Sequence, residues 1–237
     1  MPEDSLVFYS HSENSPCSYL DVPESNSIFL DPRLDLDSDM LNKLHLNGFR
    51  RSGRLIYRPQ CPSCSACWSA RVINGQFSFS KSQRKVFKRN KNLEFRWIDP
   101  TFQQEHFDLY ERYINGRHEN GDMYPASAEQ YTDFLIEGYG SHKILEARDE
   151  DNILVGACVV DQFYDGLSAI YSYFDPELAR NSLGQLFVLA LIQFGQQAGL
   201  PYTYLGYYVK GSAKMEYKAN YSPLEVFKDN HWQALKE

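Results

Sequence analysis

The chain has 237 residues, enough for one large domain or two small ones with a substantial core. Aromatic residues make up 15% of it, which argues against disorder over most of its length. The net charge of −7 hides an asymmetry, because residues 50–96 hold twelve Lys or Arg and one acid, a net +11, against −18 elsewhere. The acidic remainder repels polyanions, whereas the basic segment is suited to bind one; a solvated basic surface without a partner is the alternative.

In the first half of the chain, turn-forming residues over 1–49 predict loops, with a short helix over 40–48 that ends at Gly48. Short strands are predicted at 56–59 and within 69–80, on either side of a cysteine-rich turn. A basic helix is predicted over 81–92, capped by Ser80 or Ser82.

The second half of the chain shows clearer helix and strand patterns. Helical spacing of apolar residues predicts one helix over 102–114 and a second around 131–135. Strands are predicted over 143–147, 153–163 and 167–174, with a hairpin turn at 164–166, then a long helix over 182–199 and a strand over 201–209. This order indicates an α+β fold with a central sheet. A boundary near residue 97 predicts a basic, cysteine-containing domain over 1–97 and a second domain over 98–237.

Targeting signals and common nucleotide motifs are not found. The acidic N-terminus lacks a basic region followed by an apolar stretch, and the apolar run 153–160 is too short to span a membrane. We therefore expect a cytoplasmic protein with reduced thiols and no membrane partner. The chain has no GxxxxGK[ST], no GxGxxG after a strand and no GxSxG, which argues against ATP hydrolysis, nicotinamide redox chemistry and serine hydrolysis.

Three cysteines repeat at CxxCxxC spacing, and a fourth lies far upstream. Cys61, Cys64 and Cys67 with Cys17 could hold zinc or an iron–sulfur cluster, because both need four thiolates or their equivalent. A metal-free structural turn is the alternative. Cys158, within an apolar strand, is expected to be a small buried hydrophobic residue.

Several stretches together resemble the aminoacyl-tRNA–protein transferases of the arginyltransferase family. They are GFRRSGRLIYRPQCPSCSACWSARV (48–72), QRKVFKRN (83–90), YINGRHENGDM (113–123), DGLSAIYSYFDP (165–176), SLGQ (182–185) and YLGYYVKGSAKMEYKANYSPLE (204–225). The later stretches resemble the bacterial branch of that family. The resemblance implies transfer of leucine from leucyl-tRNA to the α-amine of proteins that begin with Asp or Glu, which marks them for degradation. It also implies a second domain folded like the GCN5-related acetyltransferases, and no DNA partner.

The implied reaction converts an ester into an amide, so we expect it to need neither ATP nor a cofactor. The acceptor amine has a reference pKa of roughly 7.7–8.0, so orientation and oxyanion stabilisation should supply most of the rate. We expect Asp161 to orient or relay the ammonium proton and Tyr171 to donate to the oxyanion. Ser182 begins a helix whose N–H groups could bind an anion or a carbonyl oxygen. Ordinary structural roles are the alternative for all three.

Two binding tasks remain. Phosphate contacts, with aromatic support for the acceptor end of the tRNA, are predicted for Lys81, Lys85, Lys88, Arg89, Lys91, Tyr207 and Lys218. The acidic first residue of the acceptor needs a cationic pocket, for which the candidates are Arg71, Arg84, Arg117 and Lys214.

Two other functions stay open at the level of sequence. A CoA-dependent N-acetyltransferase would need the loop R/Q-x-x-G-x-G/A before the long helix, where this chain has RNSLGQ (180–185). A non-catalytic RNA-binding adaptor with a zinc knuckle over 61–67 would bind RNA and transfer no amino acid.

Overall fold

The computed structural model describes residues 8–13, 16–22, 24–119, 121, 123–139 and 141–236. These residues fall into two compact units: the first holds the chain up to Ile73 together with Tyr204 onward, and the second holds Asn74–Thr203. Their extents differ from the predicted domains 1–97 and 98–237, because the C-terminal strands pair within the first unit. Each unit is mixed α/β, in agreement with the expected fold class.

The first unit contains two groups of strands. Strands β1 (Phe8–Glu13), β2 (Ser25–Leu30), β4 (Leu55–Pro59) and β3 (Arg50–Ser52) form one antiparallel sheet in the order β1-β2-β4-β3. The second group has the order β12-β11-β5-β10, made by β12 (His231–Ala234), β11 (Leu224–Lys228), β5 (Cys67–Ile73) and β10 (Tyr202–Val209). Helix α1 (Ser38–Leu46) and the short 3-10 helix η4 (Glu216–Tyr221) complete this unit.

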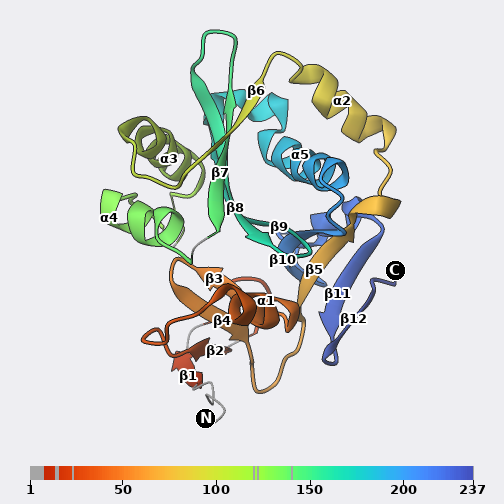
Figure 1. Ribbon diagram of the computed structural model, residues 1–237. Helices are drawn as coiled ribbons and strands as arrows, with labels where there is room; N and C mark the ends of the chain where they lie inside the picture. Colours follow the sequence, from red (N-terminus) through yellow and green to blue (C-terminus); the bar gives the residue numbers. More distant parts are fainter. Residues whose placement is uncertain are drawn as a thin grey trace. The chain divides into compact units, whose positions relative to one another are not determined.

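The second unit is built on a four-stranded antiparallel arrangement with the order β9-β8-β7-β6. Its strands are β6 (Glu94–Ile98), β7 (His142–Arg148), β8 (Leu154–Phe163) and β9 (Gly166–Phe174). Figure 1 shows α3 (Gln104–Arg117) and α4 (Ala128–Tyr131) on one face, and α2 (Lys81–Arg89) and α5 (Leu183–Gln197) on the other. Shorter turns are η1 (Asn74–Gln76), η2 (Thr132–Ile136) and η3 (Pro176–Asn181).

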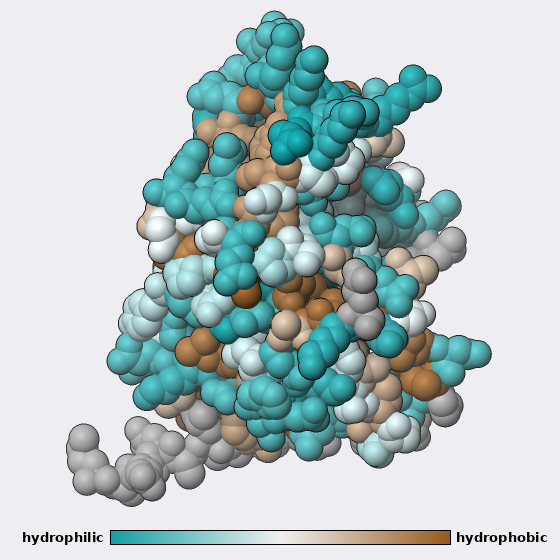
Figure 2. Space-filling view, turned by 90° about the vertical axis from the view of Figure 1, so that its right-hand side faces the viewer, coloured by the Kyte–Doolittle hydropathy of each residue, from teal (hydrophilic) through white to brown (hydrophobic). Residues whose placement is uncertain are grey.

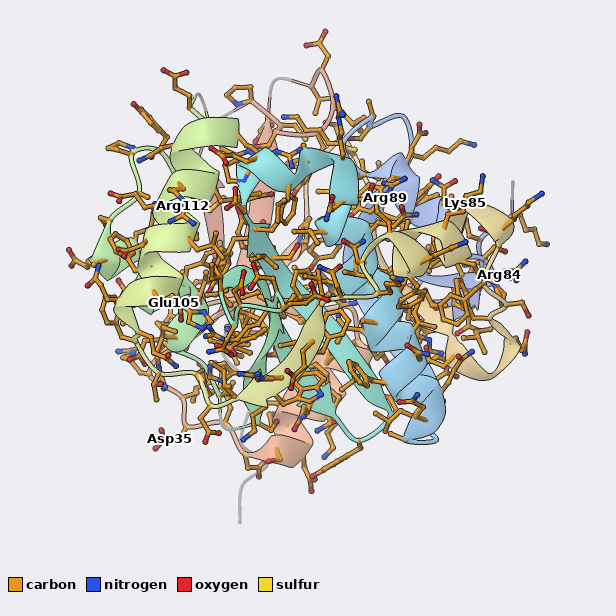
Figure 3. All side chains as sticks on the ribbon, turned by 90° about the horizontal axis from the view of Figure 1, so that it is seen from above. Asp35, Arg84, Lys85, Arg89, Glu105 and Arg112 are labelled. Carbon is orange, nitrogen blue, oxygen red and sulfur yellow. The ribbon has the colours of Figure 1, made fainter. Side chains whose placement is uncertain are left out.

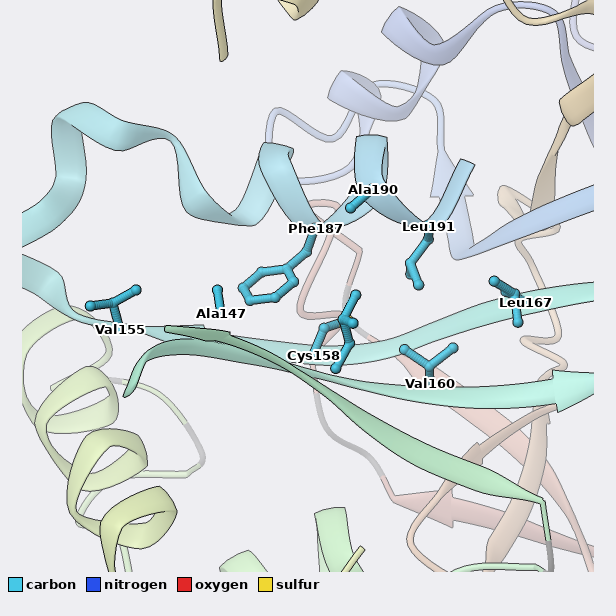
Figure 4. Close-up of a cluster of buried hydrophobic side chains, with 9 residues drawn as sticks. Ala147, Val155, Cys158, Val160, Leu167, Phe187, Ala190 and Leu191 are labelled. Carbon is cyan, nitrogen blue, oxygen red and sulfur yellow. The ribbon is translucent and has the colours of Figure 1, made fainter. Parts of the chain in front are cut away.

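The apolar face of α5 forms the core on one side of these strands. Phe187, Ala190 and Leu191 pack with Cys158 and Val160, all at most 2% exposed (Figure 4). The burial of Cys158 confirms its expected role as a small hydrophobic residue. The opposite face carries the tyrosines and polar groups of the candidate site.

Several large hydrophobic residues of the described chain are exposed, among them Tyr164, Ile153 and Tyr217. On the face that Figure 2 shows, hydrophilic residues predominate and hydrophobic ones form separate small patches. Within the described part of the chain, no helix has the length and apolar character to cross a membrane.

Candidate active site

A row of polar side chains crosses three neighbouring strands of the second unit. His142 of β7 lies opposite Asp161 of β8, and Asp161 lies opposite Ser168 of β9. Directly opposed residues in antiparallel strands point to the same face, so the three side chains form one buried row. They are 7%, 9% and 1% exposed. The Oγ atom of Ser168 has no hydrogen-bond partner among the described residues.

Tyr171 projects from the same face of β9. It lies opposite Val159, two residues before Asp161 on β8, so the two predicted catalytic residues are brought to one face. The Tyr171 ring meets those of Tyr110 and Phe134, with centroids 6.5 and 5.2 Å away. Burial, followed by nearby tyrosines, raises the pKa of Tyr171, so its hydroxyl keeps its proton. No described residue hydrogen-bonds to that hydroxyl, which leaves it able to donate.

A buried hydrogen-bond chain supports this face of β9. His106 Nε2 lies 2.8 Å from Glu146 Oε1, and His106 Nδ1 lies 2.7 Å from the Tyr173 hydroxyl. The Tyr173 and Tyr131 hydroxyls are 3.1 Å apart. Burial lowers the pKa of His106 and outweighs the opposing effect of the hydrogen bond that His106 donates to Glu146. A neutral His106 therefore donates to Glu146 and accepts from Tyr173.

Arg148 neutralises the carboxylates at the end of that chain. Its guanidinium donates to both Glu146 oxygens, at 2.8 and 2.9 Å, and to Glu105. Burial acts to raise the pKa of Glu146, but hydrogen bonds from Arg148 and His106 lower it below its usual value. The sequence analysis did not identify this network, since its members come from four separate elements, α3, α4, β7 and β9.

Ser182 does not join the row at Asp161. It occupies the N-cap position of α5 in the left-handed conformation, with φ 57° and ψ 45°, and its side chain makes no capping hydrogen bond. The first turn of α5 packs on the far end of β9, where a Cβ on Gly184 would lie 3.3 Å from Phe174. Phe174 is six residues from Ser168, about 20 Å along the strand.

Helix α2 presents its basic residues to solvent. Gln83, Val86 and Asn90 are buried beneath it, and Ser80 and Gln83 form a capping box that confirms the predicted start. The predicted tRNA contacts in this segment are all exposed: Lys81, Lys85, Lys88, Arg89 and Lys91. Figure 3 shows Arg84, Lys85 and Arg89 on one side of the second unit. Arg89 also donates to the carbonyl of Arg180 and so joins α2 to the chain before α5.

The predicted cations for the acceptor's acidic residue do not form one pocket in either unit. The Arg71 guanidinium is engaged in intramolecular contacts, since it pairs with Glu225 at 2.7 Å and lies 4.1 Å from the centre of the Trp232 ring. Arg84 and Lys214 are exposed in different units. Arg117 is exposed and packs over the ring of Phe174 at 5.3 Å.

Two residues predicted to contact tRNA are buried in the first unit. Tyr207 is 5% exposed, and its hydroxyl donates to the carbonyl of Gly48 at 3.0 Å, so it offers no face to a base. Lys218 is also 5% exposed, with its Nζ donating to the carbonyl of Tyr207. Neither is a surface contact, because η4 and β10 carry both side chains into the interior.

The four predicted metal ligands lie in the first unit as neighbouring thiols. Cys61 and Cys64 form a β-bridge across their turn. Burial, followed by the charges of Cys17, Cys61 and Cys64, raises the pKa of Cys67 to about 12. Yet the described residues contain no group of three or more Cys, His, Asp or Glu arranged to hold a metal ion. The thiols are neighbours but do not form a ligand set, so the residues do not fit a metal site as they stand.

Comparison with known proteins adds independent evidence. The family described as arginine-tRNA-protein transferase matches through its N-terminal part at residues 15–85 and its C-terminal part at 105–228. The aspartate/glutamate leucyltransferase of Hahella chejuensis is 43% identical over 231 residues, 98% of each chain. That of Saccharophagus degradans is 42% identical over 217 residues, 92% of each chain. Among solved structures, FemX has a TM-score of 0.49 at 10% identity, over 80% of this chain and 65% of that one.

Proposed function

The chain belongs to the arginine-tRNA-protein transferase family, and we propose that it is an enzyme that transfers leucine from leucyl-tRNA to the α-amine of proteins beginning with Asp or Glu. The observation that carries this proposal is the near-complete match to two leucyltransferases. The new N-terminal leucine would mark the acceptor for degradation in the cytoplasm. The second unit would adopt a fold like the GCN5-related acetyltransferases.

The transfer forms a C–N bond and breaks the ester C–O bond to the tRNA. The acceptor amine attacks the ester carbonyl, the carbonyl oxygen becomes an oxyanion, and collapse releases the ribose hydroxyl. Asp161 would hold the ammonium and take its proton, and the ribose oxygen gains a proton as it leaves. The protonated Tyr171 hydroxyl would donate to the oxyanion. No step is assigned to a metal ion or another cofactor.

The exposed basic face of α2 is our proposed tRNA contact. Among the described residues, no carboxylate forms an ion pair with Lys81, Lys85 or Lys88, and all three lysines are exposed. A nucleic acid can therefore displace counterions there without breaking an existing ion pair.

The test combines purified protein, labelled leucyl-tRNA and peptides that begin with Asp, Glu or Ala. We expect leucine on the Asp and Glu peptides and none on the Ala peptide. If arginyl-tRNA alone serves as donor, the leucine assignment fails. Absence of transfer with tRNA still bound would instead support an RNA-binding adaptor.

A further inference from the structure

A set of buried polar side chains in the second unit has no part in the transfer steps described above. We call it the His106 clamp, and its members are His106, Glu146, Arg148, Tyr173 and Tyr131. The His106 side chain is fully buried, and those of Glu146 and Arg148 are 4% and 10% exposed. Replacing a buried ion pair with apolar residues is often neutral or stabilising, so its retention calls for an explanation other than stability.

The hydrogen bonds of the clamp have one order of donors and acceptors. Arg148 donates to both oxygens of Glu146, so this carboxylate is ionised and can only accept from Nε2 of His106. Nδ1 of the neutral imidazole then accepts from the Tyr173 hydroxyl, 2.7 Å away. The Tyr173 oxygen is left to accept from the Tyr131 hydroxyl, at 3.1 Å. The carboxylate therefore fixes the orientation of both hydroxyls through the imidazole.

Tyr131 connects the clamp to the predicted oxyanion donor. It is the last residue of α4, and η2 continues the helical backbone directly after it. This segment is π-helical, a form that is frequent at functional sites. Phe134 lies in it, three residues after Tyr131, and the centre of its ring is 5.2 Å from that of Tyr171. The clamp thus anchors to β9 the same helical segment that packs against Tyr171.

We propose that His106 is a positioning residue for leucine transfer, which acts through the clamp to hold the ring of Tyr171 in place. This inference rests on the proposed function. A displacement of about 1 Å in a reacting group can cost about 10²-fold in rate, so an oxyanion donor must be held firmly. No described residue hydrogen-bonds to the Tyr171 hydroxyl, which leaves the packing of its ring to do so.

The first experiment removes one hydroxyl of the clamp and keeps its ring, as Tyr173→Phe. We expect kcat for transfer to a peptide beginning with Asp to fall roughly 10-fold, while KM for leucyl-tRNA and for the peptide changes less than about twofold. The matched control is Thr203→Val, which removes a buried hydrogen bond of similar length, 2.8 Å to Asn74, beside α5. It should leave kcat unchanged.

Changes at His106 test the same route from its other end. His106→Leu removes the acceptor and should lower kcat as Tyr173→Phe does, whereas His106→Gln, whose amide can both donate and accept, should restore part of the loss. Because the two residues act in series, the double variant should lose no more than the worse single variant. Losses that multiply would overturn the proposal. So would a Tyr173→Phe change that still costs about 10-fold when Tyr171→Phe is already present.

The outcomes separate the two claims. An unchanged kcat in Tyr173→Phe, or a loss confined to KM, overturns the role of His106 while leaving leucine transfer intact. Wild-type protein that transfers no leucine would refute the proposed function instead.

A second measurement needs neither a variant nor transfer. ¹⁵N NMR of the histidine-labelled wild-type protein at pH 7.5 reports which ring nitrogen of His106 carries a proton. We expect a proton on Nε2 and none on Nδ1. A protonated Nδ1 could not accept from Tyr173 and would overturn the proposal, even if the variants do not fold.

Discussion

At the scale of single residues, Tyr171 is the most direct test of the chemistry. Tyr171→Phe keeps the ring that packs on Phe134 and removes the hydroxyl that no described residue hydrogen-bonds. We expect the single-turnover rate of transfer to fall about 10²-fold or more, the usual cost of losing one oxyanion donor. Tyr110→Phe is the control, because its hydroxyl contacts only the sulfur of Met123, at 3.7 Å. A Tyr171→Phe enzyme with the wild-type rate would remove Tyr171 from the mechanism.

The buried charge of Lys218 predicts a gain in stability on its removal. Lys218→Met removes a buried charge that no described carboxylate compensates and keeps an apolar stem of similar length. We expect the free energy of unfolding in urea to rise by about 1–3 kcal/mol. A fall in the free energy of unfolding would show that the hydrogen bond to the carbonyl of Tyr207 outweighs the cost of burying the charge.

Residue chemistry alone indicated part of the candidate site, whose roles stay predictions. Asp161 and Tyr171 were identified because strand ends and strand tyrosines are visible in the sequence, and the register brings them to one face. Lys218 and Tyr207 were placed on the surface because of their charge and aromatic character. Their burial depends on how an irregular segment folds over β10, which no local pattern encodes.

At the scale of elements, α2 carries the prediction for tRNA. Lys85→Glu with Lys88→Glu reverses two exposed charges, whereas Arg89 is better left in place because it holds the carbonyl of Arg180. We expect the Kd for tRNA to rise and the slope of log Kd against log salt to fall by about 1.5, for two lost phosphate contacts. The measurement is filter binding between 50 and 200 mM salt.

The matched control for α2 makes the same change in net charge elsewhere. Lys43→Glu with Lys236→Glu alters two exposed lysines outside the basic segment. If both double variants weaken tRNA equally, the effect comes from total charge and α2 has no specific role.

Long, periodic elements were predicted well. The basic helix, the hairpin of β8 and β9, and α5 were confirmed, because each is specified by a local repeat and a turn or cap. Strands β1, β2, β3, β6, β11 and β12 were missed. They are at most six residues long and lie in turn-rich sequence, and β11 is stabilised by pairing with β5, about 150 residues earlier.

At the scale of the whole molecule, two of the buried histidines, His45 and His106, contribute to the response to acid. Burial, followed by the charge of Arg50, holds the pKa of His45 well below its usual value, and its Nδ1 accepts from Arg50 at 3.0 Å. His106 is likewise lowered by burial. In the unfolded chain both return to about 6.5, so unfolding takes up protons below that pH. The free energy of unfolding should therefore fall as pH drops from 6.5 to 5, with up to about 1.4 kcal/mol per pH unit from each histidine.

Urea unfolding at pH 7.5, 6.5 and 5.5 checks this, and His45→Gln should reduce the slope below pH 6.5. The pKa values of Glu105 and Glu146 are lowered, so these carboxylates titrate below this window and do not interfere. A slope that is the same in His45→Gln and wild type would show that His45 does not contribute.

The interrupted first unit also has a consequence for synthesis on the ribosome. Residues 74–203 are contiguous and can pack as soon as they emerge, whereas β5 has no β11 until residue 224 and beyond are translated. At 5–20 residues per second, roughly 8–30 s pass between the synthesis of β5 and of its partner. During that interval β5 lacks the strand that pairs with one of its two edges, and an open strand edge in a nascent chain favours aggregation unless a chaperone covers it.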